Sequence, residues 1–477
     1  AAGLVWLYRT DYLKDTAVLE VPVLHLVLAM TVIGVYVAAS GNCGLSWGGY
    51  DIPWRNVMLT DLIDHEWPVV FDNGYALAYY FAFWLVPALV GKACGFGAAF
   101  FALWLEQVLV MGVALLLMAH LIDVRTPAQL WMVLAVFLLW SGVNLVGAAF
   151  SQIAGFDGYQ MDMSYNENYS GRFYYRSNLD CIEETYNQIV VWLAVPLMLH
   201  NRRMNSYLFL GLLLLPYSPW LTVGIVVFMV VLAIVEAREL CRGKRWWSAM
   251  LATLREVASP ANIAAACSLG IVFIAFFAAS LYAPASADAA TEAAAAAASA
   301  SASATGTGVA GILDVSSFSL FKWVGFLVFA FCEYGIYALF LFRSHRHDPL
   351  YWTTVIWLTV APFFWVGAFE GVDFGMDATL PGLAVLMVLM MGFCKDEVMG
   401  KVLGFKNLLF IIVVSIVVLG QGMQLAYQVE MLYENQTFYD VRDSYQITSY
   451  GDKPLDSVSN FVCGAPDDTF FFSELSR

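Results

Sequence analysis

Long apolar segments alternate with short polar segments along most of the chain. A helix needs about 20 apolar residues to cross a bilayer, and the pattern predicts about eleven crossing helices. Helices are expected because lipid offers the backbone no hydrogen-bond partner. The predicted crossings are Val18–Ala39, Phe96–Ala119, Gln129–Phe150, Tyr186–Leu199, Asn205–Tyr217, Trp220–Glu236, Asn262–Ala283, Ser317–Phe342, Leu350–Ala368, Leu380–Phe393 and Asn407–Ala426.

One apolar segment, Tyr75–Gly91, is short and contains Pro87, which indicates a helix that lies in or dips into the outer leaflet without crossing. The distribution of basic residues favours this interpretation, because Lys and Arg concentrate on cytoplasmic loops. If the segment crossed, the basic turns at 200–205 and 343–347 would face outward. The layout therefore places four polar segments outside, at 41–92, 151–185, 370–377 and 427–477.

The remaining segments complete the predicted organisation. Residues 1–426 form a transmembrane domain and residues 427–477 an acidic external tail. Residues 237–256 are basic and resemble an interfacial helix. Residues 284–311 are rich in Ala and Ser, which is typical of a flexible loop. The opening residues 1–9 resemble the end of a helix leaving the membrane, so we expect at least one further span upstream.

Composition agrees with a multi-pass membrane protein. Of the 477 residues, 61% are hydrophobic and only 13% charged, against roughly 25% charged in soluble proteins. The net charge of −15 argues against a nucleic-acid partner. We expect no nucleotide cofactor, because the chain has no phosphate-binding glycine loop.

The first external loop, 41–92, is the longest polar interruption in the first half of the chain. Carboxylates and tryptophans beside a bilayer suit a site for a polar, ring-shaped group, and they equally suit a hydrated loop with interfacial tryptophans. The residues concerned are Asp51, Asp61, Asp64, Glu66 and Asp72, with Trp47, Trp54 and Trp67.

Several stretches resemble the GT-C class of membrane glycosyltransferases, and more closely a group of large bacterial multi-pass proteins of that class. They are DIPWRNVMLTDLIDHEWPVVF, YALAYYFAFWLVPALVGK, WSGVNLVG, YRSNLDCIEETYNQIVVWLAVPL, GVDFGMDATLPGLAVL and NFVCGAPDDTFFF, spread across the whole chain. The resemblance implies an all-α, GT-C-like fold in the bacterial cytoplasmic membrane. It also implies transfer of a sugar from a polyprenyl-phosphate donor to an envelope glycan, lipid or protein acceptor on the extracytoplasmic face.

Such a reaction needs a carboxylate base near the acceptor hydroxyl. Asp51 is the first candidate, since this class keeps an acidic residue early in the first external loop. Asp61 and Asp64 are further candidates, at a spacing that suggests the start of a short helix, where Asp61 would cap the helix instead. Glu370 and Asp373 are candidates for a general acid or for metal ligands. The alternative is that they simply belong to a solvated loop. The need for a divalent metal is left open.

The donor phosphate requires cationic groups, and Arg pairs with phosphate through two parallel hydrogen bonds. Arg172 and Arg176 are the main candidates, with Arg55 as a third. If residues 172–176 form a helix, both guanidinium groups project from one face. The alternative is that these arginines pair with Asp162, Glu167 or Asp180. Trp54 and Tyr174 would stack on a sugar ring or lie at the membrane interface with Phe173 and Tyr175.

Two positions depart from the resembling proteins. Asn144 stands where they tend to have an acid, and Asp377 stands where they tend to have Arg. These changes put the family chemistry in doubt and favour, as one alternative, a non-catalytic role in envelope assembly. A transporter or flippase for a lipid-linked glycan is the other alternative, suggested by Glu106 and Glu333 within predicted spans.

Three of the cysteines fall on the predicted outer side, where oxidising conditions permit disulfides. The sequence predicts a bond from Cys463 to Cys43 or to Cys181.

Overall fold

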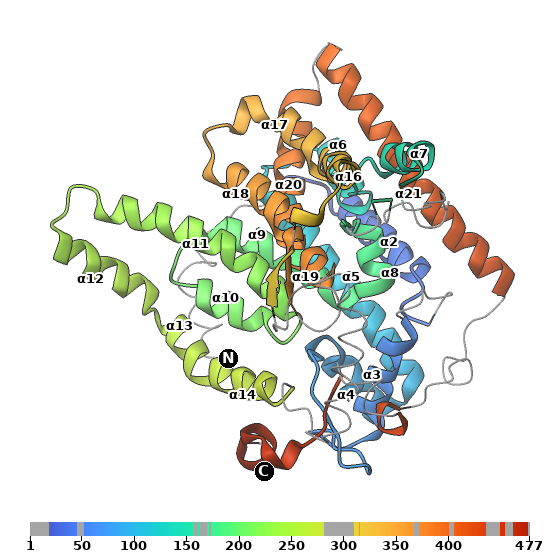
Figure 1. Ribbon diagram of the computed structural model, residues 1–477, viewed down its shortest axis with the longest axis vertical. Coiled ribbons are helices and arrows are strands. Elements are labelled where there is room, and N and C mark those ends of the chain that lie inside the picture. Colours follow the sequence, from blue (N-terminus) through green and yellow to red (C-terminus); the bar gives the residue numbers. More distant parts are fainter. Residues whose placement is uncertain are drawn as a thin grey trace.

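The computed structural model describes residues 19–44, 52–156, 161, 169–170, 173–280, 310–313, 315–366, 372–399, 405–435, 449–453 and 461–475. Within these residues the chain is mostly helical, with two small two-stranded sheets. Figure 1 shows a central group of helices, with α21 along one edge and the α11–α12 pair projecting from the opposite side.

Six helical segments in the described part of the chain are long and apolar enough to cross a membrane. Three shorter apolar helices accompany them. The six are Phe96–Leu121, Pro219–Cys241, Pro260–Ala279, Leu320–His345, Phe374–Val398 and Leu408–Met431. The shorter helices are α2 (Val23–Ala39), α4 (Ala82–Cys94) and α6 (Pro127–Leu138). The chain is therefore an all-α, multi-pass membrane protein, and the count of eleven crossings stays a prediction.

The long segments contain the following elements. They are α5 (Phe96–Leu121), α11 (Pro219–Cys241), α13 (Pro260–Ala265) with the π-helix η4 (Ala266–Gly270) and α14 (Ile271–Ser280), α16 (Leu320–Ala330) with the π-helix η6 (Phe331–Gly335) and α17 (Ile336–His345), α19 (Val372–Asp377), α20 (Leu380–Phe393) with the π-helix η8 (Cys394–Val398), and α21 (Phe405–Asn435).

Shorter elements connect and cover them. They are α3 (Ile52–Asp64), α7 (Asn144–Ala154), α8 (Asn178–Thr185), η3 (Tyr186–Val190), α9 (Val191–Asn201), α10 (Tyr207–Leu214), α12 (Trp246–Val257), η5 (Val315–Ser317), α18 (Pro349–Val360), η7 (Ala361–Phe363), η9 (Tyr450–Asp452), η10 (Pro466–Asp468) and η11 (Phe471–Leu475).

Many helices begin at a hydrogen-bonding cap residue followed by proline. The cap side chain accepts a hydrogen bond from a backbone N–H of the first turn, and proline suits the first helical position because that N–H has no partner in the helix. The pairs are Thr126–Pro127 at α6, Ser218–Pro219 at α11, Ser259–Pro260 at α13 and Asp348–Pro349 at α18. Local sequence thus sets where these helices start.

The prediction of one uninterrupted helix over Gln129–Phe150 is wrong. α6 ends at Leu138 and α7 begins at Asn144. The break is stabilised by tertiary hydrogen bonds: the Val143 N–H donates to the Cys332 carbonyl at 2.8 Å, and the Tyr337 hydroxyl donates to the Ser141 carbonyl at 2.6 Å. Apolar composition alone does not reveal the break, because its partners lie far away in sequence.

The short segment Tyr75–Gly91 is not helical throughout. Strand β1 (Ala76–Leu77) precedes α4, whose 13 residues span about 20 Å at 1.5 Å per residue. That length is below the roughly 30 Å of a bilayer core. The geometry therefore agrees with a helix that does not cross.

The C-terminal segment pairs with the first loop. Strand β4 (Val462–Cys463) runs antiparallel to β1, with Ala76 opposite Cys463. A second sheet joins β2 (Ala310–Ile312) to β3 (Phe364–Val366). The domain boundary predicted at 426/427 lies inside α21, which continues to Asn435.

α20 lies in the middle of the bundle, and its side chains are nearly all buried (Figure 1). Such a helix is apolar on every side, as expected when protein surrounds it. α19, immediately before α20, carries Asp377 into the same interior. The predictions for residues 1–18 and for most of 284–311 concern residues outside the described part of the chain.

Candidate functional site

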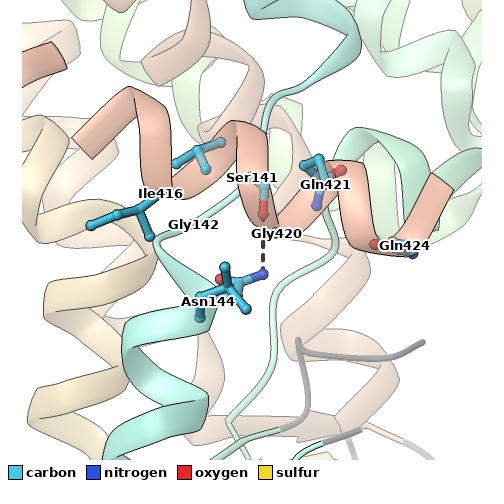
Figure 2. A pocket seen from close by; sticks show the side chains of 9 residues that line it. Ser141, Gly142, Asn144, Ile416, Gly420, Gln421 and Gln424 are labelled. Carbon is cyan, nitrogen blue, oxygen red and sulfur yellow. Dashed lines mark hydrogen bonds between the residues drawn. The ribbon is translucent and has the colours of Figure 1, made fainter. Parts of the chain in front are cut away.

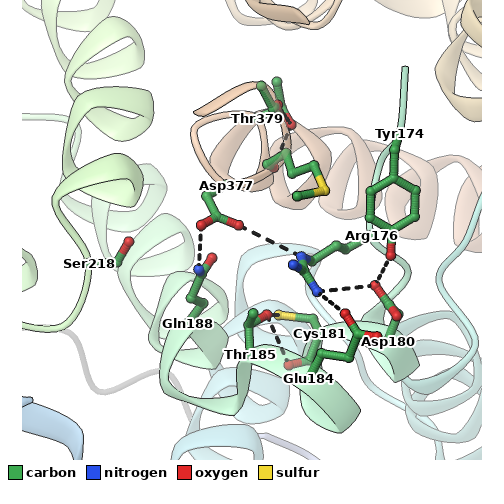
Figure 3. A network of polar contacts seen from close by, with 12 residues as sticks. Tyr174, Arg176, Asp180, Cys181, Glu184, Thr185, Gln188, Ser218, Asp377 and Thr379 are labelled. Carbon is green, nitrogen blue, oxygen red and sulfur yellow. Dashed lines mark hydrogen bonds and ion pairs between the residues drawn. The ribbon is translucent and has the colours of Figure 1, made fainter. Parts of the chain in front are cut away.

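A buried ionic cluster surrounds Arg176 (Figure 3). Its Nη1 lies 2.8 Å from Glu184 Oε2 and 3.5 Å from Asp180 Oδ2, and its Nε lies 3.7 Å from Asp377 Oδ1. The side chains of Arg176 and Asp377 are each 7% exposed, that of Asp180 is 1% exposed and that of Glu184 is 27% exposed. A buried charge is tolerated only where opposite charges and hydrogen bonds compensate its lost hydration.

Two neutral side chains support the carboxylates of this Arg176 cluster. The Tyr174 hydroxyl donates to Asp180 Oδ2, and Gln188 Nε2 donates to Asp377 Oδ2 at 2.7 Å. Burial lowers the pKa of Arg176, but the neighbouring Tyr174 and carboxylates outweigh it and raise that pKa well above its ordinary value. Arg176 is therefore a fixed cation.

Local structure explains how these residues meet. Arg176 lies in an extended segment, and Ser177 caps α8 by accepting a hydrogen bond from the Asp180 N–H at 3.0 Å. Asp180, Glu184 and Gln188 follow at intervals of four, so the α8–η3 helix directs all three toward one side. Glu184 and Gln188 are not among the residues predicted from the sequence, although the interval of four residues was the signal that could have revealed them.

The helical alternative for residues 172–176 is wrong at its C-terminal end, because 173–177 are not helical. Of the proposed acidic partners for Arg176, the structure bears out Asp180. Asp162 and Glu167 lie outside the described residues.

Of the two alternatives for the aromatic residues 173–175, a place at the membrane interface is wrong, since all three rings are buried within the protein. Phe173 packs against Phe326 with ring centroids 5.0 Å apart, and the Tyr175 hydroxyl donates to the Leu358 carbonyl. Tyr174 lies beside Arg176, whose guanidinium carbon is 5.8 Å from the ring centroid.

Arg55 reaches the edge of the Arg176 cluster from α3. Its Nε donates to the Glu184 carbonyl, and its Nη1 donates to Asn187 Oδ1 at 3.0 Å. The guanidinium is half-buried and also lies near Tyr79, whose pKa burial raises and Arg55 partly lowers. Arg55 and Arg176 thus flank the same acidic residue, one through its backbone and the other through its side chain.

Asp61 contacts the C-terminal segment and not the Arg176 cluster. Its Oδ2 accepts a hydrogen bond from the Tyr450 N–H at 3.0 Å. Burial raises the pKa of Asp61 to about 6, against the lowering effect of hydrogen bonds from Ser449 and Tyr450. The prediction that Asp61 caps the start of a helix is wrong, since Asp61 lies in the last turn of α3. Asp64, the last residue of α3, is exposed.

Trp54 also supports the C-terminal segment. Its carbonyl accepts a hydrogen bond from the Tyr450 hydroxyl, and its ring stacks on Phe461 with centroids 6.1 Å apart. Two of the predicted substrate-contacting or catalytic residues, Trp54 and Asp61, therefore hold two distant parts of the chain together in this structure.

Four predicted site residues are not placed. Asp51, Arg172 and Glu370 lie outside the described residues, as does the side chain of Asp373. Asp51 directly precedes Ile52, the first residue of α3. The side chain of Ile52 is fully buried.

A second polar cluster lies at the break between α6 and α7. Glu333 in the π-helix η6 is 3% exposed, and its Oε1 accepts a hydrogen bond from the Tyr169 hydroxyl at 3.0 Å. π-Helical turns are frequent at functional sites. A Cβ at Gly142 would lie 2.4 Å from Glu333 Oε2 and 2.5 Å from Asn144 Oδ1, so only glycine permits this approach.

A small cavity of about 10 Å³ adjoins this cluster, with room for about one water molecule (Figure 2). Ser141 and Asn144 line it from the break, and Gln421 and Gln424 line it from α21. It is too small to receive a sugar. Gln424 Nε2 also donates to Glu183 Oε2 at 2.9 Å, which links α21 to α8.

The two polar clusters approach each other through Glu183. Burial raises the pKa of Glu183 well above its ordinary value, and Asp180 adds to that effect. Hydrogen bonds from Gln424 and Gln428 act in the opposite direction.

The disulfide prediction is wrong, because Cys43, Cys181 and Cys463 are buried and form no disulfide in the structure. Cys43 lies beside Gln107, whose Nε2 is 3.2 Å from the Cys43 Sγ and 3.0 Å from Asn42 Oδ1. Gln107, which is buried in α5, therefore has side-chain partners in the Asn42–Cys43 turn.

Among the described residues, no group of three His, Cys, Asp or Glu side chains is arranged to hold a metal ion. The carboxylates around Arg176 are directed at its guanidinium and leave no arrangement suited to a divalent cation.

No family model, no curated protein and no solved structure matches the chain.

Proposed function

We propose that this chain is a membrane glycosyltransferase that moves a sugar from a polyprenyl-phosphate donor to an acceptor hydroxyl. The observation that carries the proposal is the Arg176 cluster. There α3, the segment from Arg176 through α8, and α19 bring two arginines and three carboxylates together beside the predicted external loops. The resemblance described above supports the choice of reaction.

The charges of the cluster suit the two ends of such a transfer. Asp180, Glu184 and Asp377 outnumber the one guanidinium, Arg176, that bridges their side chains. A carboxylate in such surroundings is suited to accept the proton of an acceptor hydroxyl. The hydroxyl oxygen would then bond to the sugar anomeric carbon as the bond from that carbon to the phosphate oxygen breaks, releasing polyprenyl phosphate.

In this proposal Arg176 and Arg55 have different roles. Arg176 already pairs with three carboxylates through its Nη1 and Nε, so in this proposal it holds the carboxylates in position. Arg55 is half-buried at the edge of the cluster, where an entering phosphate would meet it first. Its planar guanidinium suits phosphate oxygens. Asp51, adjacent to the start of α3, is the base that the resemblance favours.

The proposal is tested with the purified protein in nanodiscs. Polyprenyl-phosphate donors carrying different radiolabelled hexoses and pentoses would be supplied with extracted envelope glycans and lipids as acceptors. We expect transfer of label from one donor, with release of polyprenyl phosphate, and at least a tenfold loss in Arg55→Gln. The exposed variant Lys322→Gln is the control. Absence of transfer from every donor would contradict the proposal.

A transport function is the second candidate, and Glu106 favours it. This residue lies within the candidate span α5, and its buried Oε2 has no hydrogen-bond partner among the described groups. Ionisable groups inside spans often mark transport pathways. Movement of an intact lipid-linked glycan across proteoliposomes, lost in Glu106→Gln, would support transport over transfer.

A further inference from the structure

The turn between α11 and α12 presents three positive charges within four residues. Arg242, Lys244 and Arg245, which we name the basic turn, are all exposed. Gly243 between them has φ +72°, a conformation that favours glycine and allows the chain to reverse tightly. The Lys244 N–H donates to the Cys241 carbonyl at 3.0 Å, which closes the turn.

The charges of the basic turn have no acidic partner within the described part of the chain. No ion pair involves Arg242, Lys244 or Arg245 there. This contrasts with Arg176, which three carboxylates surround, and with the exposed Arg125, which pairs with Asp123 at 2.9 Å. The basic turn is therefore a concentrated, uncompensated positive charge.

The helix that follows the basic turn exposes an apolar surface. Trp246 and Trp247 are each 66% exposed, and Leu251 and Leu254 are 63% and 53% exposed. Trp247, Leu251 and Leu254 are separated by four and three positions, so they share one face of α12. Ala249 is the one residue of α12 that is buried.

The basic turn and α12 lie at a membrane surface, as their position between two candidate spans indicates. α11 before it and the Pro260–Ala279 segment after it are both candidate spans. The residues between two spans emerge on one side of the bilayer. Tryptophan favours the headgroup level of a bilayer, and clustered Lys and Arg beside it attract anionic lipids.

We propose that the basic turn binds the phosphate headgroup of an anionic phospholipid, while Trp246, Trp247 and the exposed face of α12 lie at the boundary between the headgroups and the acyl chains. Charge complementarity selects this occupant. A zwitterionic lipid cancels its phosphate charge with its own amine, whereas phosphatidylglycerol does not. The site is distinct from the Arg176 cluster and does not depend on the function proposed for that cluster.

Thermal unfolding of the purified full chain in detergent micelles tests the proposal. Phosphatidylglycerol added to the micelles should raise Tm by several degrees and saturate, and phosphatidylcholine or inorganic phosphate at equal concentration should give less than a quarter of that shift. The triple variant Arg242→Gln/Lys244→Gln/Arg245→Gln should lose at least half of the shift.

A second triple variant controls for net charge. Lys322, Arg343 and Arg346 are also exposed, so Lys322→Gln/Arg343→Gln/Arg346→Gln removes the same number of charges elsewhere. It should keep the shift produced by phosphatidylglycerol. Equal shifts with phosphatidylcholine or phosphate, or equal behaviour of the two triple variants, would overturn the proposal.

A further measurement needs no change of charge. Phosphatidylglycerol brominated on its acyl chains quenches nearby tryptophans, so quenching should fall measurably in Trp246→Phe/Trp247→Phe. Equal quenching in the wild type and this variant would show that the two rings do not contact lipid, and would overturn the placement of α12.

Discussion

Arg176 Nε lies 3.7 Å from Oδ1 of Asp377, joining the segment before α8 to the helix that enters the centre of the bundle. The resemblance noted in the sequence implies Arg at the position of Asp377. In this chain an arginine at that position would lie against Arg176. The acid is therefore matched to its surroundings here.

The first prediction follows from that pair. Asp377→Arg should lower the free energy of unfolding by about 3 kcal/mol or more, because it leaves two buried guanidinium groups side by side. Asp377→Asn should cost less, since Asp180 and Glu184 still pair with Arg176. Denaturant unfolding in detergent would measure both, with the exposed Asp123→Asn as control. Equal stability of Asp377→Arg and wild type would show that the cluster is not formed.

The second prediction concerns the pH dependence of the contact between α3 and the C-terminal segment. Burial raises the pKa of Asp61 from 3.8 to about 6, so the folded state holds its proton more tightly than the unfolded state. Stability should therefore fall as the pH rises from about 4 to about 6, by on the order of 2 kcal/mol.

Asp61→Asn keeps an oxygen for the Tyr450 N–H and cannot ionise. The pH dependence between pH 4 and 6 should therefore be weaker in this variant than in the wild type. Thermal unfolding at pH 4, 5, 6 and 7 would measure the difference. Superimposable pH profiles of the two proteins would contradict the raised pKa.

The third prediction tests the packing of α11 against the turn between α19 and α20. A Cβ at Gly224 would lie 2.1 Å from the Ala378 carbonyl oxygen, and a backbone atom cannot move aside easily. Gly224→Ala should destabilise the protein by about 1–3 kcal/mol. Gly422→Ala is the matched control in another span, where nothing lies within 4 Å of the added Cβ. A stable Gly224→Ala would contradict this close approach.

The fourth prediction tests the base. Asp51→Asn should abolish glycan transfer while leaving expression and unfolding temperature near those of the wild type, because a base requires an ionised carboxylate. Glu66→Gln, in the same loop and exposed, should leave transfer intact. Transfer at the wild-type rate in Asp51→Asn would remove Asp51 from the mechanism and direct attention to Glu184 and Asp377.

The fifth prediction concerns topology. A cysteine at exposed Ser344 should react with a membrane-impermeant thiol reagent only from the cytoplasmic side, because the re-entrant layout places residues 343–347 inside. Cys94, Cys241 and Cys267 are exposed and would first be changed to Ser. Labelling of this cysteine from outside would contradict the predicted layout and show that the re-entrant segment crosses the membrane.

The sequence by itself determined the class of the protein and many helix starts. Apolar segments of bilayer length depend only on composition, and pairs such as Ser218–Pro219 depend only on neighbouring residues. The short α4 was likewise evident from its length and Pro87. These features are local, so they can be read without knowing what lies nearby in space.

Tertiary structure decided where the helices break and which polar groups meet. The gap between α6 and α7 exists because Cys332 and Tyr337 satisfy its backbone groups. Trp54 and Asp61 hold the C-terminal segment because folding brings Tyr450 to them. Arg176 pairs with Asp377 because folding places the end of α19 beside it. A charge in a low-dielectric interior takes the partner that is nearest in space, and sequence spacing reveals that partner only within one helix.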